Sequence, residues 1–135
     1  FVMGEDVAEF EEAITDQTAL VILESPSSIM MRLQDIRAVV AIARKHNAKT
    51  YIDNTYCTPV FQNPLDLGVD IVMHTISKYI GGHSDIIGGV LIAKDEELIK
   101  VYLNTNDVNV KEILDCFEID NNSVPKKPLI YEIIK

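Results

Sequence analysis

The chain has 135 residues, enough for one compact domain, and 47% of them are hydrophobic. Its formal net charge of −9 argues against a surface for nucleic acid or for an anionic membrane, because either partner requires a basic patch. No apolar run is long enough to span a membrane, and no secretory signal pattern is visible. Two cysteines, Cys57 and Cys116, make neither a disulfide framework nor a zinc site. We therefore expect a cytoplasmic protein without a metal site.

The first part of the chain alternates helical and strand patterns. Asp6 is placed to cap a helix over Val7–Thr15. Ala19–Leu23 is a continuous apolar run, as expected of a strand that is covered on both faces. Apolar residues recur at helical spacing through Leu33–Arg44, and Asn47 is a suitable residue to end that helix.

The pattern continues to about residue 103 and then weakens. The further elements that we expect are strands at Lys49–Ile52, Ile71–His74 and Ile87–Ala93, a helical turn at Pro64–Leu67 ended by Gly68, a helix capped by Asp95 through about Leu103, a break at Asn104–Asp107, a modest helix at Val110–Phe117, and an apolar tail at Leu129–Ile134. The alternation predicts an α/β fold with a largely parallel sheet and helical crossovers.

One lysine stands between hydroxyls and a glycine pair, directly after a predicted strand. The segment Thr75–Asp85 reads TISKYIGGHSD. The hydroxyls of Thr75 and Ser77 can bind an anion, and the glycines Gly81–Gly82 allow a bulky group to approach the backbone. Lys78 is therefore a candidate for covalent chemistry with a phosphorylated carbonyl cofactor. The alternative is a solvated surface charge, the commonest role of a lysine.

An aspartate stands at the carboxyl end of the preceding predicted strand. In open α/β sheets ligands bind outside the carboxyl ends of the strands, so Asp53 and Lys78 can converge on one ligand. By itself, Asp53 is equally compatible with capping a turn or with holding a metal. Pyridoxal phosphate requires both groups: the amine forms a Schiff base with its aldehyde, and the carboxylate keeps its pyridine nitrogen protonated.

Four segments follow one another in an order and at a spacing that resemble the Cys/Met-metabolism (transsulfuration) enzymes: Glu24–Ser27, Ile52–Tyr56, Gln62–Asp70 and Ser77–Asp85. This family includes cystathionine γ-synthase, the cystathionine β- and γ-lyases, methionine γ-lyase and O-acetylhomoserine sulfhydrylase. The resemblance is close from about residue 5 to about residue 100. It implies part of the fold-type-I (aspartate-aminotransferase-like) large domain with pyridoxal 5′-phosphate, a sulfur amino-acid substrate such as cystathionine or a homocysteine-type compound, carbon–sulfur lyase or γ-replacement chemistry, and a homo-oligomer (dimer or tetramer).

The resemblance also implies roles for single residues. Lys78 matches the Schiff-base lysine, which also moves protons during the reaction. Asp53 matches the partner of the pyridine nitrogen, and Thr55 matches a hydroxyl beside the ring. Thr75 and Ser77 match the two hydroxyls that contact the phosphate.

One motif departs from the family pattern. Where the family has Asn-Pro, this chain has Ser28-Ile29, and that asparagine contacts the phenolic oxygen of the cofactor. Ser28 keeps a hydrogen-bonding group and is a candidate cofactor ligand, although it is shorter. One lost hydrogen bond is worth about 0.5–1.5 kcal/mol, which weakens electronic tuning without abolishing binding.

Family members are much longer than this chain. The resemblance therefore implies that residues 1–104 form part of the cofactor-binding domain and that residues 105–135 form a divergent tail or linker. A catalytically inactive fragment of such an enzyme is the alternative function. A receiver-like phospho-acceptor domain is a third reading. Lys127–Pro128 fits such a domain. However, a receiver requires an acidic pair after its first strand to bind Mg²⁺, and in this chain Glu24 is followed by Ser-Pro-Ser, so the pair is absent.

Overall fold

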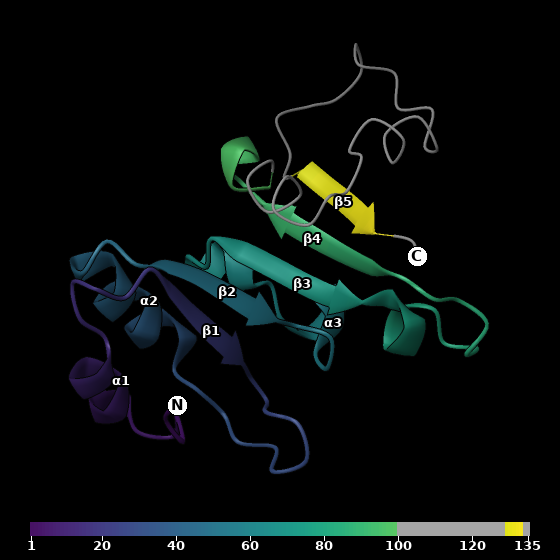
Figure 1. Cartoon of the computed structure of the whole chain (residues 1–135). Coiled ribbons are helices and arrows are strands. Elements are labelled where there is room, and N and C mark those ends of the chain that lie inside the picture. The colour runs from purple at the N-terminus through teal and green to yellow at the C-terminus, as the bar shows by residue number, and fades with distance from the viewer. Residues whose placement is uncertain (100–128, 134–135) are drawn as a thin grey trace.

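The computed structural model describes residues 1–99 and 129–133 (Figure 1). Its centre is a five-stranded sheet in the order β1-β2-β3-β4-β5. The strands are β1 (Leu20–Glu24), β2 (Lys49–Asp53), β3 (Ile71–Thr75), β4 (Gly89–Ala93) and β5 (Leu129–Ile133). The first three strands pair in parallel, whereas β4 and β5 each pair antiparallel to their neighbour. The predicted α/β fold with parallel strands and helical crossovers is confirmed for β1–β3, and β4 runs antiparallel because residues 76–88 turn the chain back beside β3.

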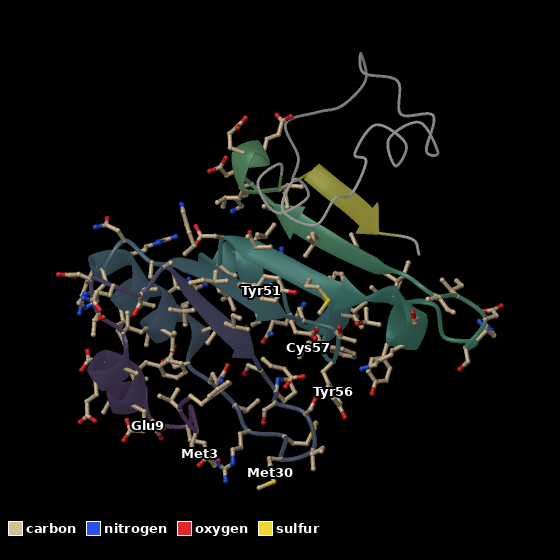
Figure 2. The ribbon with its side chains drawn as sticks, in the orientation of Figure 1. Met3, Glu9, Met30, Tyr51, Tyr56 and Cys57 are labelled. Atoms are coloured by element: carbon tan, nitrogen blue, oxygen red, sulfur yellow. The ribbon has the colours of Figure 1, made fainter. Side chains whose placement is uncertain are left out.

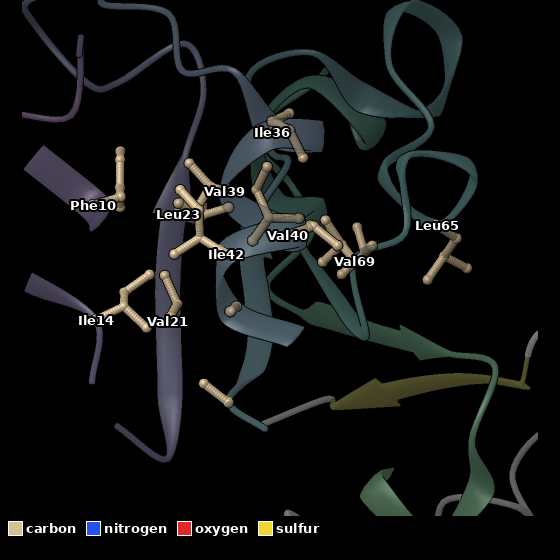
Figure 3. Packing of buried hydrophobic residues seen from close by; sticks show 14 residues of the cluster. Phe10, Ile14, Val21, Leu23, Ile36, Val39, Val40, Ile42, Leu65 and Val69 are labelled. Carbon is tan, nitrogen blue, oxygen red and sulfur yellow. The ribbon is translucent and has the colours of Figure 1, made fainter. Parts of the chain in front are cut away.

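Two α-helices lie against one face of the parallel strands (Figure 3). The helical elements are α1 (Val7–Ala13), α2 (Ile36–Lys45), the short α3 (Thr58–Phe61), the 3-10 turn η1 (Pro64–Leu67) and the wide turn η2 (Ile76–Ile80). The main core forms between α1, α2 and the sheet, and its side chains include Phe10, Val21, Leu23, Val39, Val40, Ile52 and Val72. A smaller cluster joins the strands β3 and β4 to the helical residues 96–99 and contains Ile71, Leu91, Ala93 and Ile99. Burial of these apolar side chains fixes the register of the strands and hence the place of the residues that follow them.

The first helix is capped as predicted but ends earlier than predicted. The carboxylate of Asp6 accepts a hydrogen bond from the N–H of Ala8. The predicted helix ran to Thr15, but α1 ends at Ala13 because Ile14 has extended backbone angles (φ −84°, ψ 124°). That conformation places Ile14, which is 5% exposed, in the core. The burial of Ile14 in the core therefore outweighs the continuation of the helix to Thr15.

The second helix begins later than its apolar periodicity indicated. Asp35 caps it by accepting a hydrogen bond from the N–H of Ala38 at 3.0 Å, so α2 begins at Ile36. Leu33 lies before this cap and is 70% exposed, which corrects its predicted place on the apolar face. The predicted end is confirmed: Asn47, two residues after the helix, has the left-handed φ of 57° that asparagine tolerates.

The later elements agree with the expectation in part. The strand predicted at Ile87–Ala93 begins at Gly89, and the expected apolar tail contains β5. Asp95 accepts a hydrogen bond from the N–H of Glu97 at 3.0 Å, so the predicted cap is confirmed, and residues 96–99 are helical. The end of that helix, the predicted break and the helix expected at 110–117 lie outside the described residues. Within the described part of the chain, no helix has the length and apolar character needed to cross a bilayer.

Candidate active site

The carboxyl ends of β2 and β3 are linked to each other by hydrogen bonds. Asp53 is the last residue of β2, and its Oδ1 accepts the N–H of Thr55 at 2.9 Å. The N–H of Asn54 donates to the carbonyl oxygen of Met73 at 2.8 Å, beyond the regular strand pairing. The N–H of Thr75, the last residue of β3, donates to Oγ1 of Thr55 at 2.8 Å. Three hydrogen bonds thus fix the turn at residues 53–57, called the aspartate turn below, and two of them run directly to β3.

The lysine lies in the wide turn η2 that directly follows β3. Lys78 has φ −100° and ψ −111°, which interrupts the helical backbone of the turn. The N–H of Gly81 donates to the carbonyl oxygen of Ile76 at 2.8 Å, and a Cβ on Gly81 would lie only 2.8 Å from that same oxygen. Gly82 has a left-handed φ of 77°. The turn itself therefore requires both glycines, which differs from the predicted reason, the approach of a bulky group.

The turn η2, which carries Lys78, and the aspartate turn also contact each other through two aromatic rings. The ring centroids of Tyr56 and Tyr79 lie 5.7 Å apart with an interplanar angle of 49°. Each tyrosine directly follows a predicted site residue, Thr55 or Lys78, and Figure 2 shows Tyr56 beyond the carboxyl ends of the strands. The side chain of Lys78 is exposed, and its amine has no hydrogen bond or ion pair in the described part of the chain. The amine is therefore available to react with a ligand at this edge.

The two predicted phosphate hydroxyls differ in their present contacts. Oγ1 of Thr75 donates a long hydrogen bond to the sulfur of Met73, at 4.0 Å. Oγ of Ser77 accepts the N–H of Gly88 at 3.0 Å and lies 3.3 Å from the carbonyl oxygen of the same residue. That carbonyl already accepts the N–H of Ile76 at 3.0 Å. The hydroxyl proton of Ser77 can therefore turn toward an anion without leaving the carbonyl unpaired.

Ser28 lies near the same edge but is bound to a neighbouring carboxylate. Glu24 ends β1 and lies opposite Asp53 in the strand register. The hydroxyl of Ser28 donates to Oε1 of Glu24 at 2.6 Å, and its N–H donates to Oε2 at 2.9 Å. In this arrangement Ser28 has a lone pair left for a ligand, and its hydroxyl proton is held by Glu24.

Residues 1–118 match the protein family described as Cys/Met metabolism PLP-dependent enzyme. The chain belongs to this family. The match continues past residue 104, so it includes part of the segment 105–135, which contains none of the four motifs that carry the resemblance. The cofactor of the Cys/Met-metabolism family is pyridoxal phosphate, abbreviated PLP in that description.

Individual relatives agree with the family assignment. The chain is 41% identical to cystathionine gamma-synthase of Mycobacterium leprae over 72% of this chain and 25% of the relative. It is 43% identical to cystathionine gamma-lyase of Dictyostelium discoideum over 81% of this chain and 29% of the relative. A crystal structure of cystathionine gamma-lyase from Lactobacillus plantarum, complexed with L-serine, superposes with a TM-score of 0.71 at 43% identity, over 76% of this chain and 28% of that chain. The chain thus spans between a quarter and a third of the length of these Cys/Met-metabolism relatives.

One buried polar residue at this edge was not found by the sequence analysis. His74, next to the end of β3, is 2% exposed, and its Nδ1 has no hydrogen-bond partner. Burial lowers the pKa of His74, while the carboxylate of Asp53 and a hydrogen bond to the backbone of Asn54 act in the opposite direction. The sequence signal that could have pointed to His74 is a single imidazole directly after the apolar run Ile71–Met73. Among the described residues, no group of three or more metal-ligating side chains gathers at this edge or elsewhere.

Proposed function

We propose that this chain carries the reactive lysine and the ring-binding aspartate of a pyridoxal-phosphate enzyme of sulfur amino-acid metabolism. The observation that supports this most strongly is the joining of the two turns. Thr55 binds the backbone of Thr75, and the rings of Tyr56 and Tyr79 meet, so that the segments bearing Asp53 and Lys78 leave the same edge of the sheet. Ligands of open α/β sheets bind at such an edge.

The groups at this edge fit the cofactor chemically. When bound, pyridoxal phosphate supplies an aldehyde for attachment to an amine and a pyridinium ring that withdraws electrons. Lys78 would supply the amine and later hold or release a proton at its Nζ. Asp53 would hold the proton on the pyridine nitrogen, and Thr55 would lie beside the ring. Thr75 and Ser77 would bind the phosphate, and Ser28 would accept a hydrogen bond near the ring.

The activity that we propose for the whole protein is carbon–sulfur lyase or γ-replacement chemistry on cystathionine or a homocysteine-type substrate. The support is that relatives with about 41–45% identity are named cystathionine gamma-synthase, cystathionine gamma-lyase and cystathionine beta-lyase. A catalytically inactive fragment remains the second candidate, because the chain spans only 25% and 29% of two of these relatives.

We also propose that the whole protein is a cytoplasmic dimer or tetramer of identical subunits, with residues 1–104 in the cofactor-binding domain and residues 105–135 in a tail or linker. Exposed apolar side chains near the site support the assembly: Val60 is 82% exposed, Phe61 84% and Ile87 76%. Sedimentation of the whole protein tests it, and a monomer at micromolar concentration contradicts it.

Covalent trapping tests the cofactor proposal directly. The chain is incubated with pyridoxal phosphate, reduced with borohydride and digested, and the labelled peptide is identified by mass spectrometry. We expect the label on Lys78 and its loss in Lys78→Arg, which keeps the charge but lacks a primary amine. Lys94→Arg is the matched control, because Lys94 is also exposed; its amine donates to the carbonyl oxygen of Leu65 at 3.1 Å and lies 4.0 Å from a carboxylate oxygen of Asp66. Label found mainly on Lys94, or equal labelling of both lysines, contradicts the proposal.

A further inference from the structure

The chain that leaves β2 turns back onto the end of that strand. The short helix α3 ends at Phe61, and Gln62 after it has extended backbone angles (φ −146°, ψ 130°). The carbonyl oxygen of Gln62 accepts a hydrogen bond from the side-chain Nδ2 of Asn54 at 2.9 Å. Gln62 therefore lies against the residue that directly follows Asp53. It also opens the segment Gln62–Asp70, one of the four that carry the family resemblance, in which no site residue is assigned so far.

The carboxamide of Gln62 joins the ends of two strands. Its Nε2 donates to Oδ1 of Asn54 at 2.8 Å and to the carbonyl oxygen of Ser25 at 3.0 Å. Ser25 directly follows Glu24, which lies opposite Asp53 in the last register pair of β1 and β2. The next residues of the two strands, Ser25 and Asn54, are thus connected through the side chain of Gln62. We call this connection the Gln62 bridge.

The hydrogen bonds of the Gln62 bridge fix the orientation of both amides. Nε2 of Gln62 carries two hydrogens and has two acceptors, so a reversed amide would place its oxygen against two other oxygens. Nδ2 of Asn54 also has two acceptors, the carbonyl oxygens of Gln62 and, at 3.3 Å, of Thr58. Asn54 is 1% exposed and Ser25 4%. Water therefore has little access to replace the two donors of Gln62.

Each residue that the Gln62 bridge joins is the neighbour of a candidate ring-binding group. Asn54 follows Asp53. Ser25 follows Glu24, whose carboxylate accepts the hydroxyl of Ser28 at 2.6 Å and its N–H at 2.9 Å. The bridge therefore acts on the spacing between the carboxylate of Asp53 and the pair formed by Glu24 and Ser28. The other side of the aspartate turn is already bound to β3.

We propose that Gln62 is a positioning residue, whose carboxamide holds the end of β1 against the aspartate turn and thereby sets the distance between Ser28 and Asp53. The consequence for the cofactor rests on the proposed function. In that function Asp53 and Ser28 bind different atoms of one rigid ring. Groups that act together on a ligand in this way have to be held to within about 0.5 Å, which requires support from residues around them.

Exchange of side-chain amides tests the Gln62 bridge without a substitution and without a cofactor. The chain has three glutamines, and the exposed Gln17 is the internal control. In the ¹⁵N-labelled chain, we expect the Nε2 protons of Gln62 to exchange with solvent at least about 10-fold more slowly than those of Gln17, because both are hydrogen-bonded in a partly buried place. Equal exchange rates at the two glutamines overturn the proposal.

Two substitutions test what the bridge holds. Gln62→Met keeps the length of the side chain, and Gln62→Glu keeps its shape, but neither has an N–H to donate. In both variants the backbone amides of Ser28 and Thr55, which bind the two carboxylates, should exchange about 3- to 10-fold faster, the effect of one hydrogen bond. The amide of Thr50, bound at the opposite end of β2, should keep its rate. Unchanged rates, or equal acceleration of all three amides, overturn the positioning role.

Labelling with the cofactor tests the consequence for binding. Gln62→Met should require about 3- to 10-fold more pyridoxal phosphate for half-maximal borohydride labelling of Lys78 but reach the same final extent, because the amine itself is unchanged. Gln17→Met is the matched control and should label like the unsubstituted chain. Equal half-maximal concentrations for the two variants, with both folded by circular dichroism, overturn the role. If the unsubstituted chain is not labelled at Lys78, the proposed function fails, and the amide measurements decide the inference alone.

Discussion

Replacement of Thr55 by valine tests whether the two turns depend on one hydroxyl group. Thr55 is 6% exposed, and its Oγ1 accepts the N–H of Thr75 at 2.8 Å. Valine has nearly the same shape but no acceptor, so the N–H of Thr75 loses its partner in a partly buried place. Such an unsatisfied group costs about 1–3 kcal/mol. For a chain of this size, about 4 °C of Tm corresponds to 1 kcal/mol, so Thr55→Val should lower Tm by about 4–12 °C.

Amide exchange separates this hydrogen bond from a general loss of packing. The control is Thr55→Ser, which keeps the hydroxyl and loses one methyl group, worth about 0.8 kcal/mol. The amide of Thr75 should exchange with solvent much faster in Thr55→Val and should remain protected in Thr55→Ser. Labelling of Lys78 by pyridoxal phosphate and borohydride should decrease in the valine variant only. A valine variant with a protected Thr75 amide and unchanged Tm would refute the proposed link between the turns.

Three other outcomes are expected. In an active full-length protein containing this chain, Asp53→Asn should leave circular dichroism unchanged, because the amide oxygen can still accept the N–H of Thr55. Its turnover should decrease on the order of 100-fold, because the amide cannot hold a proton on the ring, and near-normal turnover would show that Asp53 is not the ring partner. The free energy of unfolding should decrease as pH falls below 6.5, because His74 then takes up a proton in the unfolded chain but not in the folded one, and the decrease should end below the lowered pKa of folded His74. Urea titrations of His74→Gln should lack this pH-dependent decrease. Identical pH profiles of the two proteins would show that His74 does not cause it. The 135-residue chain alone should release no pyruvate, 2-oxobutyrate or thiol from cystathionine, because it spans 25–29% of two relatives, and robust turnover would contradict this.

Much of the fold could be predicted because its signals are local. The caps at Asp6 and Asp95 and the left-handed stop at Asn47 depend on a few neighbouring residues, and all three are confirmed. Helix boundaries were less accurate. Leu33 has the right spacing for the apolar face of α2, but the Asp35 cap starts the helix after it. Apolar periodicity records which residues are hydrophobic, and it does not record where the backbone begins to turn.

The sequence by itself determined the family, the cofactor that goes with it, and the candidate residues at two strand ends. Lys78 and Asp53 could be singled out because their chemistry depends on residue type within short motifs. Only the tertiary structure decided how these motifs meet: the bond from Thr75 to Thr55, the hold of Glu24 on Ser28, and the burial of His74 beneath the aspartate turn. The physical reason is that these contacts join strands distant in the chain. Their partners are set by strand register and side-chain alternation, which exist only once the sheet has formed.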